Sequence, residues 1–411
     1  MKSILIVFIF TLTYVLIAGR KLSILPIGRP AGAMLGAVLM IVIGALSPDE
    51  SYQAINHDTI ILLFSTMLLT VYLENAGFFE RMSYFAITLC KTPMTLLITI
   101  SIFSAVLSAF LVNDTVCLFM TPVVVSICVK AKIPIGPYLI GLATSANIGS
   151  SATLVGNPQN MIIGSLSGFP FIKFLMYSGP AAIVGLIINI FLLWLYYRKD
   201  LPKNYQIALK KENDIINPKT FIFTVMILLL VILGFFAGFH MGYTSLFGCI
   251  LLILYERKDP TDSFKKVDWS LLIFFSSLFI VVKAVAKTGI IDQSWTFISP
   301  YIDLSTIGGI TYFSIFMTIG SQIVSNVPMV MLTGQYLAQY KTYEIGWLLL
   351  AFTTTIAGNF TLIGSVANII VAERAKAYYT LNFWEYLKFG FISTLLVMVA
   401  GVSVFILLFN L

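Results

Sequence analysis

The sequence contains little charge for its length. Of its 411 residues only 10% are Asp, Glu, Lys or Arg, whereas 59% are hydrophobic, and the mean hydropathy is +0.96. Soluble globular domains carry about 25% charged residues, so this class is excluded, and long apolar runs are typical of polytopic membrane proteins. The Lys and Arg residues are scattered among short loops without forming a patch, so we expect a lipid bilayer and no nucleic acid as partner.

Histidine and cysteine are also scarce. His57 and His240 flank apolar stretches without the spacing of metal ligands, so no metal site is predicted from them. The cysteines show no CxxC pairing and lie in or beside apolar segments, which predicts small buried side chains and no disulfides. They are Cys90, Cys117, Cys128 and Cys249.

Enzyme motifs are absent as well. The chain has no HExxH, no GxxxxGK[ST] phosphate loop and no paired intramembrane aspartates, and no His lies near a Ser within an apolar stretch. We therefore expect no enzymatic activity and no cofactor. Without a phosphate loop, the energy source within this chain must be an ion gradient, with Na⁺ or H⁺ as the coupling ion.

Apolar stretches of about membrane-spanning length lie at 3–18, 29–47, 58–75, 178–197, 220–238, 241–255, 268–286 and 389–410. Between them, two regions at 93–168 and 306–378 are interrupted by Asn, Asp, Ser, Thr, Gly and Pro. Such residues are tolerated at membrane depth only where the backbone is buried in protein or lines a wet cavity. In each region we predict a re-entrant hairpin followed by a helix that breaks near its middle. The hairpin tips would be Asn113-Asp114 and Ser325–Pro328, and the breaks Gly149–Pro158 and Gly358–Ser365.

The two interrupted regions repeat one another. Thr153, Gly156 and Asn160 recur 208 positions later as Thr, Gly and Asn. The predicted fold is an all-α polytopic membrane protein with two inverted repeats, about ten spans, two re-entrant hairpins and two broken helices. The first repeat would be 1–197 and the second 220–411, joined by a charged cytoplasmic linker at 198–219.

The distribution of basic residues predicts the orientation in the membrane. With both termini outside, all 25 Lys and Arg residues would face the cytoplasm except Lys2, Lys173, Lys283, Lys287 and Lys341. Lys283 and Lys287 lie near one end of a span, where long side chains reach the surface; attraction of a substrate is the alternative role for them.

Interrupted segments at matching positions of two halves are the best sequence indication of a transporter's binding site. Helix ends at the breaks carry partial charges, and free carbonyl groups suit Na⁺. The alternative is that the polar side chains only join helices. The predicted substrate- or ion-binding residues are Asn113, Asp114, Thr115, Asn147, Ser150, Ser151, Thr153, Gly156, Asn157, Asn160, Ser325, Asn326, Asn359, Thr361, Gly364, Ser365 and Asn368.

Asp114 is the one acidic residue within the apolar stretch from Pro93 to Val129. An intramembrane carboxylate is costly unless it is paired or hydrated, and it typically marks an ion or proton pathway. We expect Asp114 to bind Na⁺ or carry a proton. The alternative is a structural cap that accepts hydrogen bonds from backbone N–H groups at the hairpin tip.

Several segments resemble the ion transporter superfamily, which includes ArsB-type arsenical pumps, NhaD-type sodium/proton antiporters and divalent anion:sodium symporters. ENAGFFE, VNDTVCLFMTPVV, YYRKDLPKNYQIAL, SNVP and IGS are most similar to the arsenical-pump and anion-permease branch. GNPQN, at Gly156–Asn160, is similar to the G-x-P-x-N element of the wider superfamily. The resemblance covers nearly the whole chain and implies a scaffold with a mobile transport domain, often in a homodimer that works by an elevator motion.

These observations predict an ion-coupled secondary transporter of a small anion or a metalloid, arsenite-like solute. Its substrate would be a small anionic or neutral oxyacid, and its location a prokaryotic cytoplasmic membrane. A sodium/proton antiporter that moves no anion is the alternative among transporters. An uncoupled anion channel would need the same helix ends but no coupling group, and Asp114 argues against it.

Overall fold

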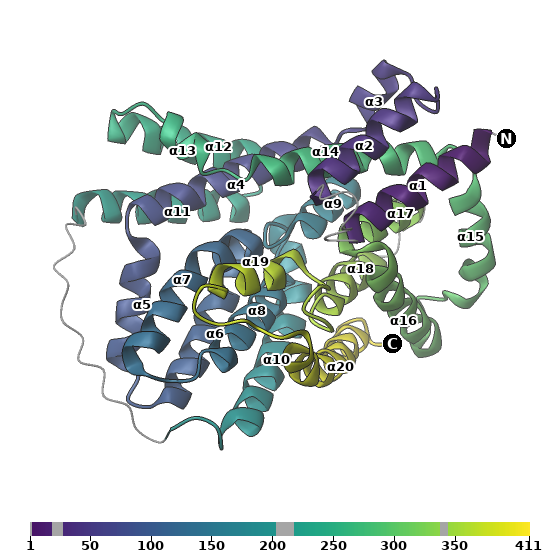
Figure 1. Ribbon diagram of the computed structural model, residues 1–411. Coiled ribbons are helices and arrows are strands. Elements are labelled where there is room, and N and C mark those ends of the chain that lie inside the picture. Colours follow the sequence, from purple (N-terminus) through teal and green to yellow (C-terminus); the bar gives the residue numbers. More distant parts are fainter. Residues whose placement is uncertain (1, 19–27, 203–217, 338–343) are drawn as a thin grey trace.

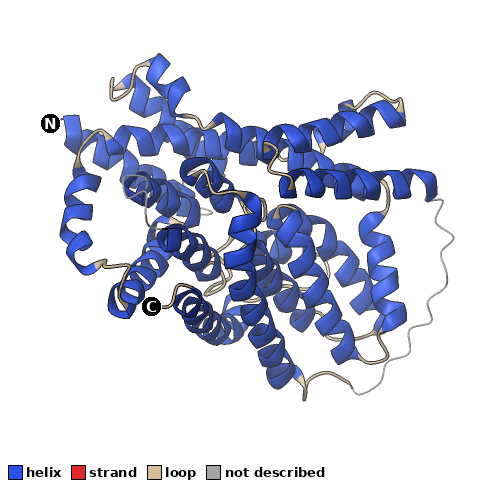
Figure 2. Ribbon diagram, turned by 180° about the vertical axis from the view of Figure 1, so that it is seen from behind, coloured by secondary structure: helices blue, strands red, loops and turns tan. Residues whose placement is uncertain are grey.

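The computed structural model describes residues 2–18, 28–202, 218–337 and 344–411. Within these ranges the chain is helical and contains no strand (Figure 2). By length and composition, eight of the described helices can cross a membrane, which confirms the predicted all-α polytopic membrane class. They are α4 (His57–Asn75), α6 (Pro93–Phe110), α7 (Asn113–Ala131), α10 (Phe171–Tyr197), α11 (Pro218–Phe236), α14 (Trp269–Ala286), α16 (Ile307–Val324) and α20 (Phe383–Leu408).

Shorter apolar helices complete the set of membrane elements. They are α1 (Lys2–Ala18), α2 (Arg29–Val42), α12 (Met241–Glu256) and α18 (Glu344–Ala357). Helices α8 (Gly136–Ser150), α9 (Pro158–Ser167), α17 (Asn326–Leu337) and α19 (Val366–Ala375) lie inside the two interrupted regions.

One layer of the molecule consists of α1, α2, α4, α11, α12 and α14, which extend alongside one another across the top of Figure 1. Within it α4 packs on α12, α2 on α14, and α11 on α12. The second part is a bundle in which α6 packs on α8, α10 on α20, and α7 on α19. The site residues predicted from the sequence lie on this bundle.

Helices α5 (Phe78–Leu89) and α15 (Ile290–Ile298) run crosswise to the first layer at opposite ends of the molecule (Figure 1). Each follows a helix of the layer and precedes a hairpin, α6–α7 or α16–α17. Helix α13 (Thr261–Lys265) lies at the end with α5, whereas α3 (Pro48–Ala54) and the N-terminus lie at the end with α15. The predicted orientation makes the α5 end cytoplasmic and the α3 end external.

The structure places the first hairpin tip two residues before the predicted one and narrows the second to the first of its predicted residues. The first hairpin turns at Leu111-Val112, so Asn113 and Asp114 are the first residues of α7. The second turns at Ser325 alone, and α17 begins at Asn326. A polar residue such as Asn113 is tolerated in the first turn of a helix, because the N–H groups there have no partner inside the helix and can bond to other groups.

The short helices α3, α5, α13 and α15, with the 3₁₀ turn η1 (Ser299–Tyr301), were not predicted. They are too short and too polar to register as spans. Most of the predicted cytoplasmic linker, residues 203–217, lies outside the described residues.

Candidate functional site

The first helix break separates α8 from α9. Asn157 begins α9 as its N-cap: its Oδ1 accepts a hydrogen bond from the Asn160 N–H at 2.9 Å, and Pro158 follows at the first helical position. The Asn160 side-chain amide then donates to the carbonyl oxygens of Ser150 (3.2 Å) and Thr153 (2.9 Å). These two carbonyl groups belong to the break, so one asparagine holds both sides of it together.

The second break, between α18 and α19, has the same arrangement 208 positions further along. Asn368, the counterpart of Asn160, donates to the carbonyl oxygens of Gly358 (2.9 Å) and Thr361 (3.1 Å). Gly358 and Thr361 are the counterparts of Ser150 and Thr153. The repeat inferred from a few polar identities therefore extends to matching hydrogen bonds.

Glycine is required at one position in each break. A Cβ atom on Gly156 would lie 2.3 Å from the Ser150 carbonyl oxygen, and one on Gly364 would lie 2.8 Å from the Gly358 carbonyl oxygen. No side chain fits at these distances, so only glycine lets each break fold back on its own carbonyl group.

Each hairpin tip contacts the break of its own half. The Asn113 N–H donates to the Gly156 carbonyl at 2.9 Å, and the Thr153 hydroxyl donates to the Ala109 carbonyl at the end of α6. In the second half, Gln322 Nε2 donates to the Ala357 carbonyl at 2.7 Å. A Cβ on Gly358 would lie 3.1 Å from Nδ2 of Asn326, so the tip of α17 also reaches its break.

Ser325, at the second tip, has φ +72° and ψ 159°. Residues other than glycine rarely adopt this backbone conformation, which costs about 1–3 kcal/mol. Strain of this kind persists where the surrounding structure holds it, and it is common at ligand sites.

Asn147, on α8, joins the two halves. Its Oδ1 accepts from Nδ2 of Asn113 at 2.8 Å and from the Ser365 hydroxyl at 3.2 Å. Its Nδ2 donates to Oδ1 of Asn359 at 2.7 Å and of Asn368 at 3.0 Å. One amide group therefore connects the first hairpin tip to the second break. We call Asn113, Asn147, Asn157, Asn160, Asn359 and Asn368 the asparagine network.

Bulk water does not reach the core of the network. Asn147 and Asn359 are 1% exposed, and Asn160 and Asn368 are fully buried. Two buried acceptors, Oδ1 of Asn160 and Oδ1 of Asn326, have no hydrogen-bond partner among the described residues. An unpaired buried acceptor costs about 1–3 kcal/mol, which a cation or a hydroxyl donor would remove.

Asp114 is buried next to Asn113, and its backbone N–H donates to Oδ1 of Asn113 at 2.9 Å. Its carboxylate receives no hydrogen bond or ion pair from any part of the chain that the structure describes, and α7 has no side-chain cap. Arg29 and Asp268 are its charged neighbours, at the first residue of α2 and just before α14. The alternative role of Asp114 as a capping residue therefore has no hydrogen bond to support it.

Many of the residues predicted for the site come together, but the side chains of Asp114, Ser325 and Asn326 make no hydrogen bond in the described structure, and three further residues make no link across the site. Ser151 bonds only the carbonyl group of Ile148 on its own helix, Thr361 contributes its carbonyl group, and Thr115 is buried without a side-chain hydrogen bond in the described structure. Ser150 is part of the network, because its Oγ accepts from Asn157 Nδ2 at 3.0 Å.

Sequence reasoning missed two partners of the network, Gln159 and Tyr386, whereas Thr355 is one of the polar residues expected at the second break. The Thr355 hydroxyl accepts from Nδ2 of Asn157 at 3.3 Å and from Nε2 of Gln159 at 3.2 Å. The Tyr386 hydroxyl, on α20, lies 3.5 Å from Oδ1 of Asn359. Gln159 lies inside GNPQN and could have been included, whereas Tyr386 comes from a helix whose sequence gives no indication of the contact.

Known proteins and one family model match this chain over most of its length. A family model described as citrate transporter matches residues 13–357. "Putative transporter arsB" from Dictyostelium discoideum is 34% identical, over 97% of this chain and 92% of the relative. "Silicon efflux transporter LSI3" from Oryza sativa subsp. japonica is 32% identical, over 96% and 95%.

A third relative, the "46 kDa membrane protein" of Mycobacterium leprae, is 28% identical over 97% of both chains. These matches confirm the resemblance that the motifs indicated. The first two relatives are named as transporters, which supports transport as the role here. The relatives come from eukaryotes as well as bacteria, so a prokaryotic origin for this chain remains a prediction.

Proposed function

This chain belongs to the citrate-transporter family, and on that premise we propose that it is an ion-coupled secondary transporter of a small oxyacid or metalloid hydroxide. The asparagine network carries the proposal. It brings together one hairpin tip and two helix breaks in a buried site that is rich in neutral donors and acceptors. Such a site suits a small hydroxylated solute, neutral or singly charged, better than a large organic polyanion.

The names of two relatives point to the same class of solute. One is named arsB and the other a silicon efflux transporter, and arsenic and silicon both occur in water as small hydroxides. The family's own description names citrate, a larger substrate with three carboxylates. The described hydrogen bonds of the asparagine network join neutral side chains and backbone groups, and no described Arg or Lys bonds to it, which favours the hydroxides.

Coupling is assigned to the tips and breaks. Carbonyl groups freed at the breaks and the unpaired Oδ1 atoms of Asn160 and Asn326 are ligands that Na⁺ prefers. The unpartnered Asp114 carboxylate would bind Na⁺ or a proton in the same step. This carboxylate is also the observation that favours the second candidate, a sodium/proton antiporter that carries no oxyacid.

Transport requires the network to open alternately to each side, because its core is closed to water. We propose that the bundle moves against the layer of α1, α2, α4, α11, α12 and α14, and that the protein acts as a homodimer, as the family resemblance implies. Cross-linking of the purified protein in membranes tests the dimer.

Ligand-induced stabilisation of the purified protein tests the proposed function. Arsenite, silicate, phosphate and citrate would each be added with and without Na⁺ at two pH values, and the melting temperature measured. A ligand at about 100 times its Kd stabilises by about 2.7 kcal/mol. We expect an ion-dependent shift with arsenite or silicate. A shift with Na⁺ or pH alone, and none with any oxyacid, would favour the antiporter.

A further inference from the structure

A cavity of about 430 Å³ lies at the end of the molecule that carries α3. It is bounded by α3, α4 and α14 on one side and by α9 and α17 on the other. The predicted orientation makes this the external side. We call it the outer vestibule.

The vestibule leads to the asparagine network along two helices. Helix α9 has Asn160 in the network and Leu166 in the vestibule, six residues or about 9 Å further along the helix. Helix α17 starts with Asn326 near the second break and carries Gln335 in the vestibule, about 14 Å away. The vestibule therefore lies one to three helical turns from the proposed binding site.

One cation in the vestibule lacks a counter-ion. The side chain of Lys283, near the end of α14, makes no hydrogen bond or ion pair within the described ranges. Lys287, one turn later on the same helix, forms an ion pair with Glu50, and this hydrogen bond lowers the pKa of the Glu50 carboxyl. Two lysines one turn apart thus differ in whether their charge is compensated.

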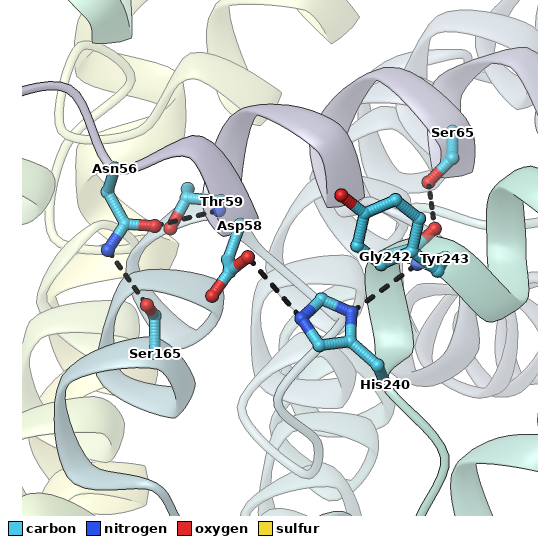
Figure 3. Close-up of polar contacts among 8 residues, drawn as sticks. All are labelled: Asn56, Asp58, Thr59, Ser65, Ser165, His240, Gly242 and Tyr243. Atoms are coloured by element: carbon cyan, nitrogen blue, oxygen red, sulfur yellow. Dashed lines mark hydrogen bonds and ion pairs between the residues drawn. The ribbon is translucent and has the colours of Figure 1, made fainter. Parts of the chain in front are cut away.

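The other charged group on the vestibule wall, Asp58, is oriented toward His240 (Figure 3). His240 Nε2 lies 3.3 Å from Oδ1 of Asp58, and Nδ1 of the same ring accepts from the Tyr243 N–H at 3.5 Å. Because Nδ1 is the acceptor, the proton sits on Nε2 and is donated to Asp58. One oxygen of the Asp58 carboxylate thus accepts from His240, while the Lys283 ammonium group makes no hydrogen bond within the described ranges.

The walls also hold neutral polar groups and one link between them. Gln53 on α3 and Gln335 on α17 line the vestibule from its two sides, and Nε2 of Gln335 also donates to the Leu332 carbonyl at 3.2 Å. Asn56 caps α4 by accepting from the Thr59 N–H at 2.8 Å, and its Nδ2 donates to the Ser165 hydroxyl on α9 at 2.8 Å (Figure 3). This bond joins the layer to the bundle beside the vestibule.

We propose that the outer vestibule binds a small oxyanion through the Lys283 ammonium group and the amides of Gln53 and Gln335. Its place on the substrate's path rests on the proposed function. An ammonium group with two neutral amides fits a singly or doubly charged oxyanion, and a cavity of this size admits one with its water. The vestibule would therefore raise the local concentration of the anionic form of a substrate.

Cysteine labelling of the reconstituted full chain tests this. Leu166 lines the vestibule and is 39% exposed, whereas the four native cysteines are buried, so a Leu166→Cys variant gives one accessible thiol. Its reaction rate is measured with a negatively charged and with a neutral thiosulfonate. Lys283→Gln should lower the ratio of the two rates about fivefold, because it removes a nearby unit charge.

Lys287→Gln is the matched control and should change the ratio less than Lys283→Gln, because Lys287 does not line the vestibule. Lys283→Arg should preserve the ratio, which separates loss of charge from misfolding. Phosphate and arsenate should slow labelling when Lys283 is present, in vesicles of phosphatidylcholine alone. Equal ratios in the two Gln variants, or protection only by added phosphatidylglycerol, would overturn the proposal.

The labelling rates do not depend on transport. If the ratio follows Lys283 but neither arsenite nor silicate gives an ion-dependent stabilisation, the vestibule stands as an anion site and the proposed function fails. If an oxyacid stabilises the protein but the ratio of the two labelling rates does not change in Lys283→Gln, anion binding in the vestibule is refuted and the proposed function stands.

Discussion

At the scale of single residues, Asp114 is the group whose role in coupling can be distinguished most clearly from a role in stability. Its carboxylate has no described partner, so Asp114→Asn removes a charge without breaking a hydrogen bond. We expect the variant to fold and insert normally, with a melting temperature within about 2 °C of wild type, but to lose the Na⁺ or pH dependence of transport.

Asp262→Asn is the control for this prediction, because the Asp262 side chain is 92% exposed on α13 and its solvent-exposed ion pair with Lys265 contributes little to stability. It should change neither stability nor coupling. Transport by Asp114→Asn with the ion dependence of wild type would rule out the coupling role. A large loss of stability would instead show that the Asp114 carboxylate is structural.

Asn147 and Asn189 are two buried asparagines that differ in location. Asn147 bonds the first hairpin tip and the second break. Asn189, on α10, bonds neither: it donates to the Thr144 and Ser145 hydroxyls at 3.1 and 3.0 Å and accepts from the Ser393 hydroxyl on α20 at 2.7 Å. Replacing either by Ala leaves buried partners unpaired, so we expect both to lose about 1–3 kcal/mol of stability. Only Asn147→Ala should also weaken ligand binding, measured as a raised Kd in the thermal-shift titration.

Equal effects of the two substitutions on the Kd would mean that the asparagine network only joins helices and does not bind the ligand. That was the alternative left open by the sequence, and buried membrane hydrogen bonds of this kind contribute only modestly each. The comparison is informative because both residues are almost fully buried and both donate through the side-chain amide.

At the scale of elements, the broken helices depend on glycine. Gly156→Ala would place a Cβ 2.3 Å from a carbonyl oxygen, and Gly364→Ala one at 2.8 Å, so we expect both variants to be destabilised, the first more than the second. Gly308→Ala on α16 should be tolerated, since a Cβ there meets nothing within 4 Å.

Size-exclusion profiles of the fluorescently tagged variants after a heating step would measure this order. A tolerated Gly156→Ala would show that the first break is not folded back on the Ser150 carbonyl. Such a result would be evidence against a shared geometry of the two breaks.

The sequence predicted the breaks better than the tips. Helix α19 begins at Val366, after the predicted end of its break at Ser365, and α9 begins at the predicted Pro158, because Gly and Pro act locally on the backbone. The first tip was displaced by two residues, since a polar side chain fits the first turn of a helix as well as the loop before it. Helices α5 and α15 were missed because crosswise amphipathic segments lack the length of a span.

The site, too, was predicted only where the sequence carries a local signal. Asn113, Asn147 and Asn359 stood out because amides are rare in apolar sequence, and they do meet. The Tyr386 hydroxyl, the Asn189 cluster and the vestibule were not predicted, because they depend on which faces of distant helices pack together. Lys283 was expected to reach the surface, with attraction of a substrate as the alternative; its lack of a counter-ion required the structure.

At the scale of the whole molecule, the two ends have different surroundings. Arg29 and Asp268, the charged neighbours of Asp114, lie at the starts of α2 and α14, the ends predicted to face the cytoplasm. Lys283 and the vestibule lie at the other end of α14. Each end of the proposed transport path therefore carries charged groups of both signs, and the neutral amides of the asparagine network lie between them.

The central claim is that an ion gradient drives a small oxyacid through the asparagine network, and accumulation against a concentration gradient tests it most directly. Proteoliposomes are loaded with arsenite or silicate at the external concentration, a Na⁺ or pH gradient is imposed, and the internal solute is followed. We expect the internal concentration to depart several-fold from the external one and to return when an ionophore dissipates the gradient. Asn189→Ala should behave as wild type and Asn147→Ala should not. A solute that crosses freely but never departs from equal concentrations under either gradient would contradict coupling and identify a channel.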